Sequence, residues 1–222
     1  MDIVEAIRSR KSIRGYKPDP VPEEVLREIL DIARRSPSAL NTQPWEITVV
    51  TGEVLDNIKR GNIEMLTAGV EPHPDFPSKP YEGIYRQRQV DLAVQIFKLM
   101  DIAREDKAKR AEWMERGFRF FDAPAAIILS MDRSVDKLES HLDIGAIVQT
   151  ICLAALNYGL GTCIEDQGIM FPEVVRKFTP IPESKLIVIG IAIGYPDWDF
   201  PANKLESKRE PLENFVTWYG FA

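Results

Sequence analysis

The sequence predicts one α+β domain in which helices cover the faces of a central sheet. Two observations support this fold class. Apolar runs rich in β-branched residues, typical of buried strands, are separated by segments whose apolar residues recur at helical spacing. The chain of 222 residues also shows no repeat, no low-complexity tract and no clean domain boundary, and its length is within reach of one large domain. We therefore expect a single domain over residues 1–222.

The first quarter of the chain predicts two helices and a strand. Residues 2 to about 9 place Ile3, Val4 and Ile7 on one face, which favours a short amphipathic helix. A polar, proline-containing loop follows, and a second helix is expected to start near Pro22, because proline suits the first helical turn. The stretch SPSALNTQPW (36–45) then leads into a strand predicted over 45–52.

The middle of the chain is dominated by helical patterns around one long loop. Residues 53–61 are expected to be helical, and residues 84 to about 117 are helical in pattern and heavily charged. Between them, 70–83 carries four prolines and no apolar period, which predicts a long loop, ordered or mobile. Loops of this length inside compact domains are more often functional than idle. A buried strand is expected over 123–132.

The last third contains the most apolar helix. The pattern predicts it over 138–159, and from Ile144 to Leu156 it is apolar on nearly all sides. Such a helix must be packed all round, in a core or across a subunit interface, and Gly159 would cap its end. A short strand (GTCIED), a short helix (PEVVRKF) and an apolar strand over 185–196 follow, before a polar tail from Asp197 onward.

The composition excludes several classes of protein. A net charge of −6 argues against a general nucleic-acid or anionic-membrane surface. Two cysteines in apolar surroundings, Cys152 and Cys163, argue for a reducing compartment and against a disulfide framework. No apolar stretch is long enough to span a bilayer, and the N-terminus lacks the order of a signal peptide, so we expect a cytoplasmic protein. The histidines, His73 and His141, lack ligand spacing, and no metal site is expected.

A local excess of positive charge stands out in this acidic chain. Residues 8–17 carry three arginines and two lysines, and Arg10, Lys11, Ser12 and Arg14 fall on the loop after the first helix. Arginine forks and a serine hydroxyl suit a phosphate or a carboxylate. A solvated basic loop that complements the C-terminal end of the first helix is the alternative interpretation.

Side-chain catalysts are not indicated. The sequence has no Gly-x-Ser-x-Gly elbow and no P-loop, and GLGTCI follows a helix and precedes a strand, the wrong order for a Rossmann turn. With no histidine partner indicated, Cys163 is expected to be a buried structural thiol. The adjacent acids Glu165 and Asp166 are expected to form a solvated turn, not an acid–base pair. A phosphate-binding loop without catalytic side chains favours a cofactor that carries the chemistry.

Six motifs occur in an order that resembles the nitroreductase-like family of FMN-dependent flavoproteins. They are RSRKSIRGY, a Pro-Val-Pro helix start, ARRSPSALNTQPW, GLGTCIED, IGIAIGYP and KREPLE. The resemblance covers roughly 1–52 and 140–215, and the stretch of about 60–120 does not match. It implies an α+β sandwich with a mostly antiparallel sheet flanked by helices, and a homodimer with FMN at the subunit interface. The stretch 60–120 would be a variable lid, and 197–222 an extension packing on the partner subunit.

The resemblance also assigns residues to the cofactor. Arg10, Lys11, Ser12 and Arg14 would contact the phosphate, ribityl chain and pyrimidine edge, and Arg209 would be a second phosphate ligand. The partner subunit would contribute Pro37, Ser38, Ala39, Asn41 and, more weakly, Gln43, with Trp45 anchoring that stretch to the core. The strand end Cys163, Ile164 and Glu165 would face the N5 edge of the flavin, mainly through backbone donors.

Some positions depart from the family pattern. Ala39 replaces a small polar residue, and Lys11 stands where arginine or histidine is frequent. Glu165 and Asp166 stand where glycines are often seen, which would add negative charge near the flavin. A nearby carboxylate disfavours the anionic reduced flavin, so a lowered redox potential is expected from this substitution.

The reaction implied is an NAD(P)H-dependent, two-electron reduction of a nitroaromatic, a quinone or a related electron-poor small molecule, in ping-pong order. The flavin N5 would accept the hydride, so no catalytic side chain is expected. Specificity would come from the cover over the flavin, with Tyr81, Tyr85, Arg86 and Arg88 as candidate substrate-binding residues. A solvated helix that merely braces the dimer is the other interpretation of this segment.

Two alternatives remain open from the sequence. A specialised member of the same family, such as a reductive dehalogenase, a flavin-consuming enzyme or an azoline oxidase, would keep the fold and change the reaction. A non-enzymatic flavin-binding protein would result if the cover blocked the flavin face.

Overall fold

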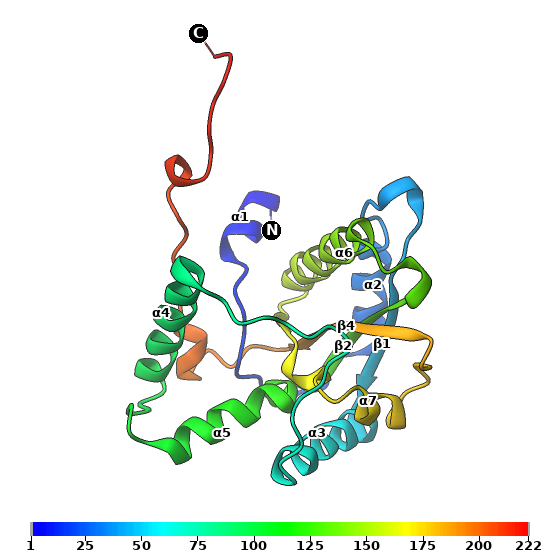
Figure 1. The fold of residues 1–222 in the computed structure, drawn as a ribbon. Helices are drawn as coiled ribbons and strands as arrows, with labels where there is room; N and C mark the ends of the chain where they lie inside the picture. The colour runs from blue at the N-terminus through cyan, green and yellow to red at the C-terminus, as the bar shows by residue number, and fades with distance from the viewer. Residues whose placement is uncertain (1, 222) are drawn as a thin grey trace.

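A central antiparallel sheet organises the structure, a computed structural model that describes residues 2–221 (Figure 1). Met1 and Ala222, the ends of the predicted domain, lie outside the described residues. The four strands found in this range are β1 (Glu46–Thr51), β2 (Ala125–Asp132), β3 (Gly161–Glu165) and β4 (Lys185–Gly194). Their order is β1-β2-β4-β3, and every neighbouring pair is antiparallel. The predicted α+β class and antiparallel sheet are confirmed.

Helices cover both faces of the sheet. One face is covered by α2 (Glu23–Ala33) and α6 (Leu138–Leu156), and the other by α3 (Gly52–Thr67) and α7 (Pro172–Phe178). Three further helices, α1 (Ile3–Ser9), α4 (Gly83–Leu99) and α5 (Lys107–Phe118), lie toward the β3 side of the sheet in Figure 1. The elements predicted from the sequence are therefore present, although several boundaries differ.

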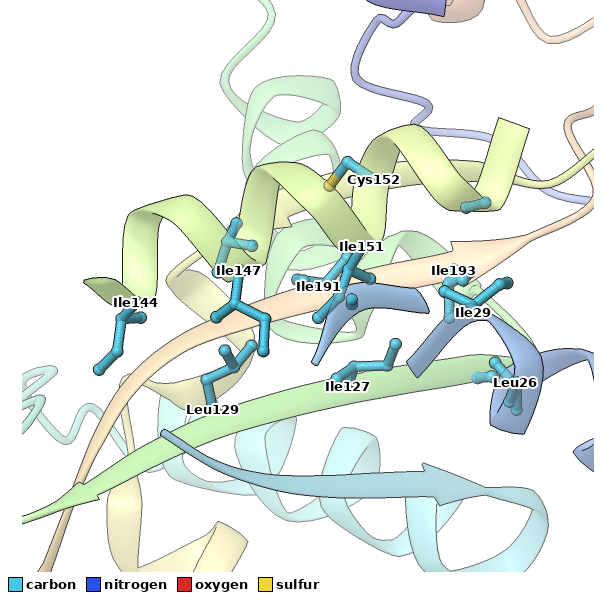
Figure 2. Close-up of a cluster of buried hydrophobic side chains, with 14 of the residues drawn as sticks. Leu26, Ile29, Ile127, Leu129, Ile144, Ile147, Ile151, Cys152, Ile191 and Ile193 are labelled. Atoms are coloured by element: carbon cyan, nitrogen blue, oxygen red, sulfur yellow. The ribbon is translucent and has the colours of Figure 1, made fainter. Parts of the chain in front are cut away.

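Strand alternation divides the core into two clusters. Ile127 and Leu129 of β2 face α2 and α6, whereas Ile128 between them faces the opposite side. Figure 2 shows three isoleucines of α6, including Ile147 and Ile151, above the aliphatic side chains of β2 and β4. A fully buried side chain of this size stabilises the fold by roughly 1.5–3 kcal/mol. The two clusters fix the sheet between its helical layers.

The proline-rich loop is tied to the body of the protein by the carboxylate of Asp75. Its Oδ2 atom accepts hydrogen bonds from the Arg176 guanidinium (2.6 Å) and from the backbone N–H of Ile187 (2.8 Å). Next to it, His73 bonds to Glu173 at 3.0 Å and Phe76 packs edge-on against His141. The part of the loop around 73–76 is thus ordered by charge and packing.

The charged segment predicted as one helical stretch over 84–117 forms two helices. The break follows α4, where Asp101 adopts a left-handed φ of 52°, and α5 begins after Asp106, whose carboxylate accepts a hydrogen bond from the N–H of Lys109. Neither glycine nor proline marks the break, so composition did not reveal it. The helix α3 also runs to Thr67, beyond the predicted end at 61.

The long apolar helix α6 is only partly enclosed by its own chain. Gly159 has a φ of +71° and ends the helix as predicted, with the N–H of Leu160 bonded to the Ala155 carbonyl. The apolar side chains of the predicted stretch Ile144–Leu156 are buried or half-buried, whereas Leu138 and Leu142, closer to the start of the helix, are 72% and 65% exposed. One face of α6 is therefore uncovered. Within residues 2–221, no helix combines the length and apolar character needed to cross a membrane.

Substitutions at Asp101 and Asp106 test the α4–α5 connection in opposite directions. Asp101→Gly should raise the free energy of unfolding by about 0.5–1 kcal/mol, because glycine adopts a left-handed φ without steric cost. Asp106→Ala should lower it by about 1 kcal/mol through loss of the helix cap. Urea denaturation of both variants measures these changes, and shifts of the same sign would contradict this account of the break.

Candidate functional site

The basic loop lies against the free edge of β3. Ser12 pairs with Thr162 in a parallel bridge, and the N–H of Ile13 donates to the Thr162 carbonyl at 2.9 Å. Ile13 is buried, and a Cβ at Gly161 would lie 2.5 Å from its side chain, so glycine is needed for this approach. The contact brings the predicted loop residues beside the strand end that carries Cys163, Ile164 and Glu165.

Two residues that sequence reasoning missed hold this loop in place. The Oδ1 atom of Asn203 accepts from the N–H of Arg14, and its Nδ2 donates to the carbonyls of Gly15 and Asp197, all at 2.7 Å. From α5, Arg116 donates to the Arg14 carbonyl at 3.1 Å and pairs with Asp122. Asn203 thus bonds the N–H of Arg14 and the carbonyl of Gly15, and Arg116 bonds the carbonyl of Arg14.

The positive charge of the loop has no carboxylate partner among residues 2–221. Arg10, Lys11 and Arg14 are half-buried, yet no ion pair in that range involves them. Elsewhere Arg116 and Arg176, which are similarly or more deeply buried, each pair with an aspartate. Partly buried charges in proteins are generally paired, so this unpaired cluster is suited to an anionic ligand.

The thiol of Cys163, in the middle of β3, has the buried position that the sequence predicted. Cys163 is buried, and that burial raises its pKa to about 12. The thiol therefore stays protonated and poorly nucleophilic at neutral pH. The next side chain, Ile164, points the other way and is partly exposed at the surface beside the basic loop.

The expectation for Glu165 was wrong. Its side chain is 8% exposed and accepts a hydrogen bond from the N–H of Gly168 at 2.8 Å, whereas Asp166 is exposed. Burial raises the pKa of Glu165 to about 8, so the carboxyl is mostly uncharged at pH 7. The solvated turn predicted here applies to Asp166 alone, and the lowered redox potential expected from a Glu165 carboxylate loses its basis.

The stretch 36–45 is held at another part of the sheet, by α6. The N–H of Ala39 donates to both carboxylate oxygens of Asp143 at 3.1 Å, and Ser36 donates to Thr150 at 2.9 Å. The predicted anchor Trp45 packs on the core between α2, α6 and the sheet. No hydrogen bond or ion pair in the described part of the chain links this stretch to the basic loop.

The same stretch is conformationally strained. Leu40, Asn41 and Gln43 have φ values of 52°, 59° and 45°, and the N–H of Gln43 is satisfied by the Ser38 hydroxyl. A left-handed conformation costs a residue other than glycine roughly 1–2 kcal/mol. Leu40 is also 97% exposed. Strain of this kind is concentrated at functional sites, which agrees with an exposed recognition surface.

The remaining predicted residues are not joined to the loop by described contacts. Arg209 bonds to Ser207 in the tail, and Arg88 pairs with Glu210 at 2.9 Å. Tyr81 and Tyr85 are largely exposed, and Arg86 donates to Gln89 on its own helix. Groups of three or more His, Cys, Asp or Glu that could hold a metal are absent from residues 2–221.

Comparison with known proteins identifies the family. Residues 7–195 match the nitroreductase family. The chain belongs to the nitroreductase family. Among its relatives, a nitrobenzene nitroreductase of Ectopseudomonas oleovorans is 34% identical over 219 residues, which cover 97% of this chain and 96% of that protein. A 4-nitrobenzoate reductase of Pseudomonas putida is 33% identical and covers 99% and 96%.

Solved structures of nitroreductases share the whole fold. The FMN- and NADPH-dependent nitroreductase NfnB from Sphigopyxis sp. strain HMH superposes with a TM-score of 0.95 at 28% identity, over 100% of both chains. The NfnB of Mycobacterium smegmatis in complex with NADPH gives 0.92 at 25% identity, over 98% and 97%. The stretch of about 60–120, expected to lie outside the family resemblance, is therefore shared with these nitroreductases.

Removing the side chain of Asn203 tests the support of the basic loop. In Asn203→Ala, the N–H of Arg14 loses its partner, and the carbonyls of Gly15 and Asp197 each lose one of two hydrogen bonds. The free energy of unfolding should therefore fall by about 2–3 kcal/mol. Asn214→Ala removes an exposed asparagine bonded to Glu210 and should change stability by less than about 0.5 kcal/mol. Equal effects in denaturant titrations would contradict the proposed support.

Proposed function

We propose that the protein is an FMN-dependent NAD(P)H oxidoreductase that reduces the nitro group of aromatic compounds. The observation that carries the proposal is the half-buried, unpaired charge of Arg10, Lys11 and Arg14 beside the end of β3. Nitroaromatic reductases among the relatives and the FMN- and NADPH-dependent structural neighbours support the same activity. When bound, FMN would supply the electron-transfer chemistry that side chains do not.

The residues present fit this cofactor. Arginine forks bind phosphate bidentately, and Arg10 and Arg14 flank the Ser12 hydroxyl on a loop whose backbone is fixed by Asn203. Positive charge from Lys11 or Arg14 would also stabilise negative charge that develops on a reduced ring. The neutral Glu165 places no opposing charge there at pH 7. We propose that Cys163, Ile164 and Glu165 contribute backbone groups to the ring edge.

We further propose that two copies of the chain complete each site. The apolar face of α1, with Ile3 and Ile7, is exposed, and it adds to the uncovered face of α6. Contiguous exposed apolar surfaces are typical of protein–protein contacts. The occupant we propose is a second copy, whose strained 36–45 stretch would supply Pro37, Ser38, Ala39, Asn41 and Gln43 to the cofactor.

The C-terminal tail supports the same arrangement. Ala202, Asn203 and Leu205 are buried on their own chain, whereas the aromatic residues beyond them are exposed. Figure 1 shows this last segment extending away from the body of the protein. The exposed aromatic side chains are Phe215, Trp218, Tyr219 and Phe221. We propose that this segment packs on the partner and brings Arg209 to the cofactor.

The acceptor would be covered by α4 and the loop before it. Tyr81, Tyr85 and Arg86 are exposed there and are proposed to contact the acceptor. Because Arg88 is already paired with Glu210, Arg86 is the arginine of this cover that has no ion pair within residues 2–221. A single free arginine would still favour an acceptor that carries a carboxylate.

The cofactor site is tested by matched arginine variants. Arg10→Gln should weaken FMN binding at least about tenfold, because a charge-assisted bond to phosphate is lost, while riboflavin binding should change little. Arg8→Gln, on the exposed surface of α1, should leave both unchanged. Fluorescence titration measures the affinities of the native protein and both variants for FMN and for riboflavin. An equal loss for the two ligands in Arg10→Gln would contradict the phosphate role of Arg10.

The activity is tested with the FMN-loaded protein under anaerobic conditions. NADPH or NADH should bleach the flavin absorption, and 4-nitrobenzoate or nitrobenzene should restore it with oxidation of further nicotinamide. Bleaching without reoxidation by nitroarenes would point to another acceptor within the family. No bleaching by either nicotinamide would favour a non-enzymatic flavoprotein and overturn the proposed activity.

The subunit arrangement is tested by light scattering. The native protein should show about twice the chain mass of 25.2 kDa. Ile7→Glu combined with Leu142→Glu should shift it toward the monomer and reduce FMN affinity, because charges would be placed on the proposed interface. Val54→Glu, on the exposed surface of α3 across the sheet from α6, is the control. A monomeric native protein that binds FMN tightly would contradict the composite site.

A further inference from the structure

Glu165 occupies a pocket that the chain leaves open for its carboxyl group. It is the last residue of β3, and its side chain points inward, on the face opposite to Ile164. A Cβ at Gly168 would lie 2.8 Å from its Oε1 atom, and a Cβ at Gly190 of β4 would lie 3.0 Å from it. The ring of Phe120 would lie 2.5 Å from a Cβ at Gly168 and 3.1 Å from a Cβ at Gly190. The carboxyl is thus enclosed where only glycines leave enough room.

Within residues 2–221, the enclosed carboxyl interacts with backbone N–H groups of the turn 166–168 and with no cation. Its Oε2 atom accepts from the N–H of Gly168, and its Oε1 atom has no partner among residues 2–221. No lysine or arginine of the described chain forms an ion pair with it; Arg116, from the neighbouring α5, is paired with Asp122. A buried carboxylate without a counterion is costly, so this environment favours the protonated form.

Among the titratable groups near Glu165, the charged neighbour Asp166 also opposes its ionisation. Asp166 follows it on the same turn and raises its pKa through charge repulsion. Cys163 on the same strand and Tyr16 from the N-terminal loop are neutral, and their own pKa values are raised mainly by burial and in part by Glu165. The cation near those two groups is Arg14, which lowers their pKa values. The residues that α3 and β4 place near this turn, Asn62 and Gly190, are uncharged.

The carboxyl holds the turn that follows β3. Gly168 donates its N–H to Glu165, and its carbonyl accepts from Nδ2 of Asn62 at 2.9 Å. Asn62 is fully buried and also donates to the Phe118 carbonyl. The turn from Glu165 to Gly168 is therefore fixed from both sides in the interior. If Glu165 became charged, it would have to move toward water, and the end of β3 would move with it.

We propose that Glu165 is a positioning residue for the cofactor: its uncharged carboxyl holds the end of β3 in the form that binds FMN, and loss of its proton at alkaline pH loosens that strand end and releases FMN. This inference rests on the proposed function. Since burial raises the pKa of Glu165 to about 8, the change falls above neutral pH. The protonated form is the one that binds, so affinity should fall by up to about tenfold for each pH unit above 8.

The test is the FMN dissociation constant of the full-length protein between pH 6 and 9.5. The native protein should bind FMN independently of pH below about 7 and progressively more weakly above about 8. Glu165→Gln, an uncharged isostere, should remove this alkaline loss while binding FMN near neutral pH. Asp166→Asn, at the exposed neighbour, should retain it. Identical pH profiles for the native protein and Glu165→Gln would overturn the proposal.

A second measurement follows the carboxyl itself in the FMN-free protein. The side-chain carbon of Glu165, observed by ¹³C NMR and assigned by its absence from Glu165→Gln, should titrate near pH 8. Titration near its ordinary value of about 4.3 would overturn the inference even if FMN binds. If the native protein does not bind FMN at pH 7, the proposed function is wrong, whatever the NMR titration shows. The role of Glu165 in cofactor binding is then overturned as well.

Discussion

The pairing of the N-terminal loop with the outer edge of β3 is the contact on which the candidate site depends. β3 is the last strand of the sheet, and an edge strand exposes unpaired backbone groups. Ser12 and Ile13 pair with Thr162 at that edge, which fixes the position of the loop along β3. Asn203 and Arg116 then form hydrogen bonds with the backbone N–H and carbonyl of Arg14. The arginine side chains of the loop therefore start from a fixed backbone. Removing that support would leave the charges without a defined position.

Besides the single residue Asp101, conformational strain within residues 2–221 is concentrated in two stretches of the chain, and each has its own restraint. The exposed stretch around Leu40 is held through Ala39 by Asp143 of α6. Next to Glu165, Phe120 to Asp122 are all left-handed, with φ values from 52° to 60°, and Asp122 is fixed there by Arg116 and Arg119. Three consecutive residues other than glycine in this region are costly. The packed helices on both sides supply the stability that offsets this cost.

Local pattern was enough to predict the layers of the fold but not the supports of the site. Strands and helices were recognised because apolar spacing directly reflects which face is buried, as in α2 and β4. Asn203 and Arg116 gave no local signal, since they bond to Arg14 from positions 189 and 102 residues away. Glu165 was the instructive error. Two adjacent acids suggest solvent, but strand alternation places Glu165 on the buried face with Cys163, and that spacing could have predicted its burial.

The two cysteines acquire a meaning beyond packing once the proposed chemistry is considered. Cys152 and Cys163 are both almost fully buried, and burial raises the pKa of each thiol. Stepwise reduction of a nitro group passes through electrophilic nitroso compounds, which react with thiolates in preference to thiols. Thiols that stay protonated and enclosed are poor targets for such products. The protein would therefore produce reactive electrophiles while neither of its two cysteines is an accessible thiolate that could react with them.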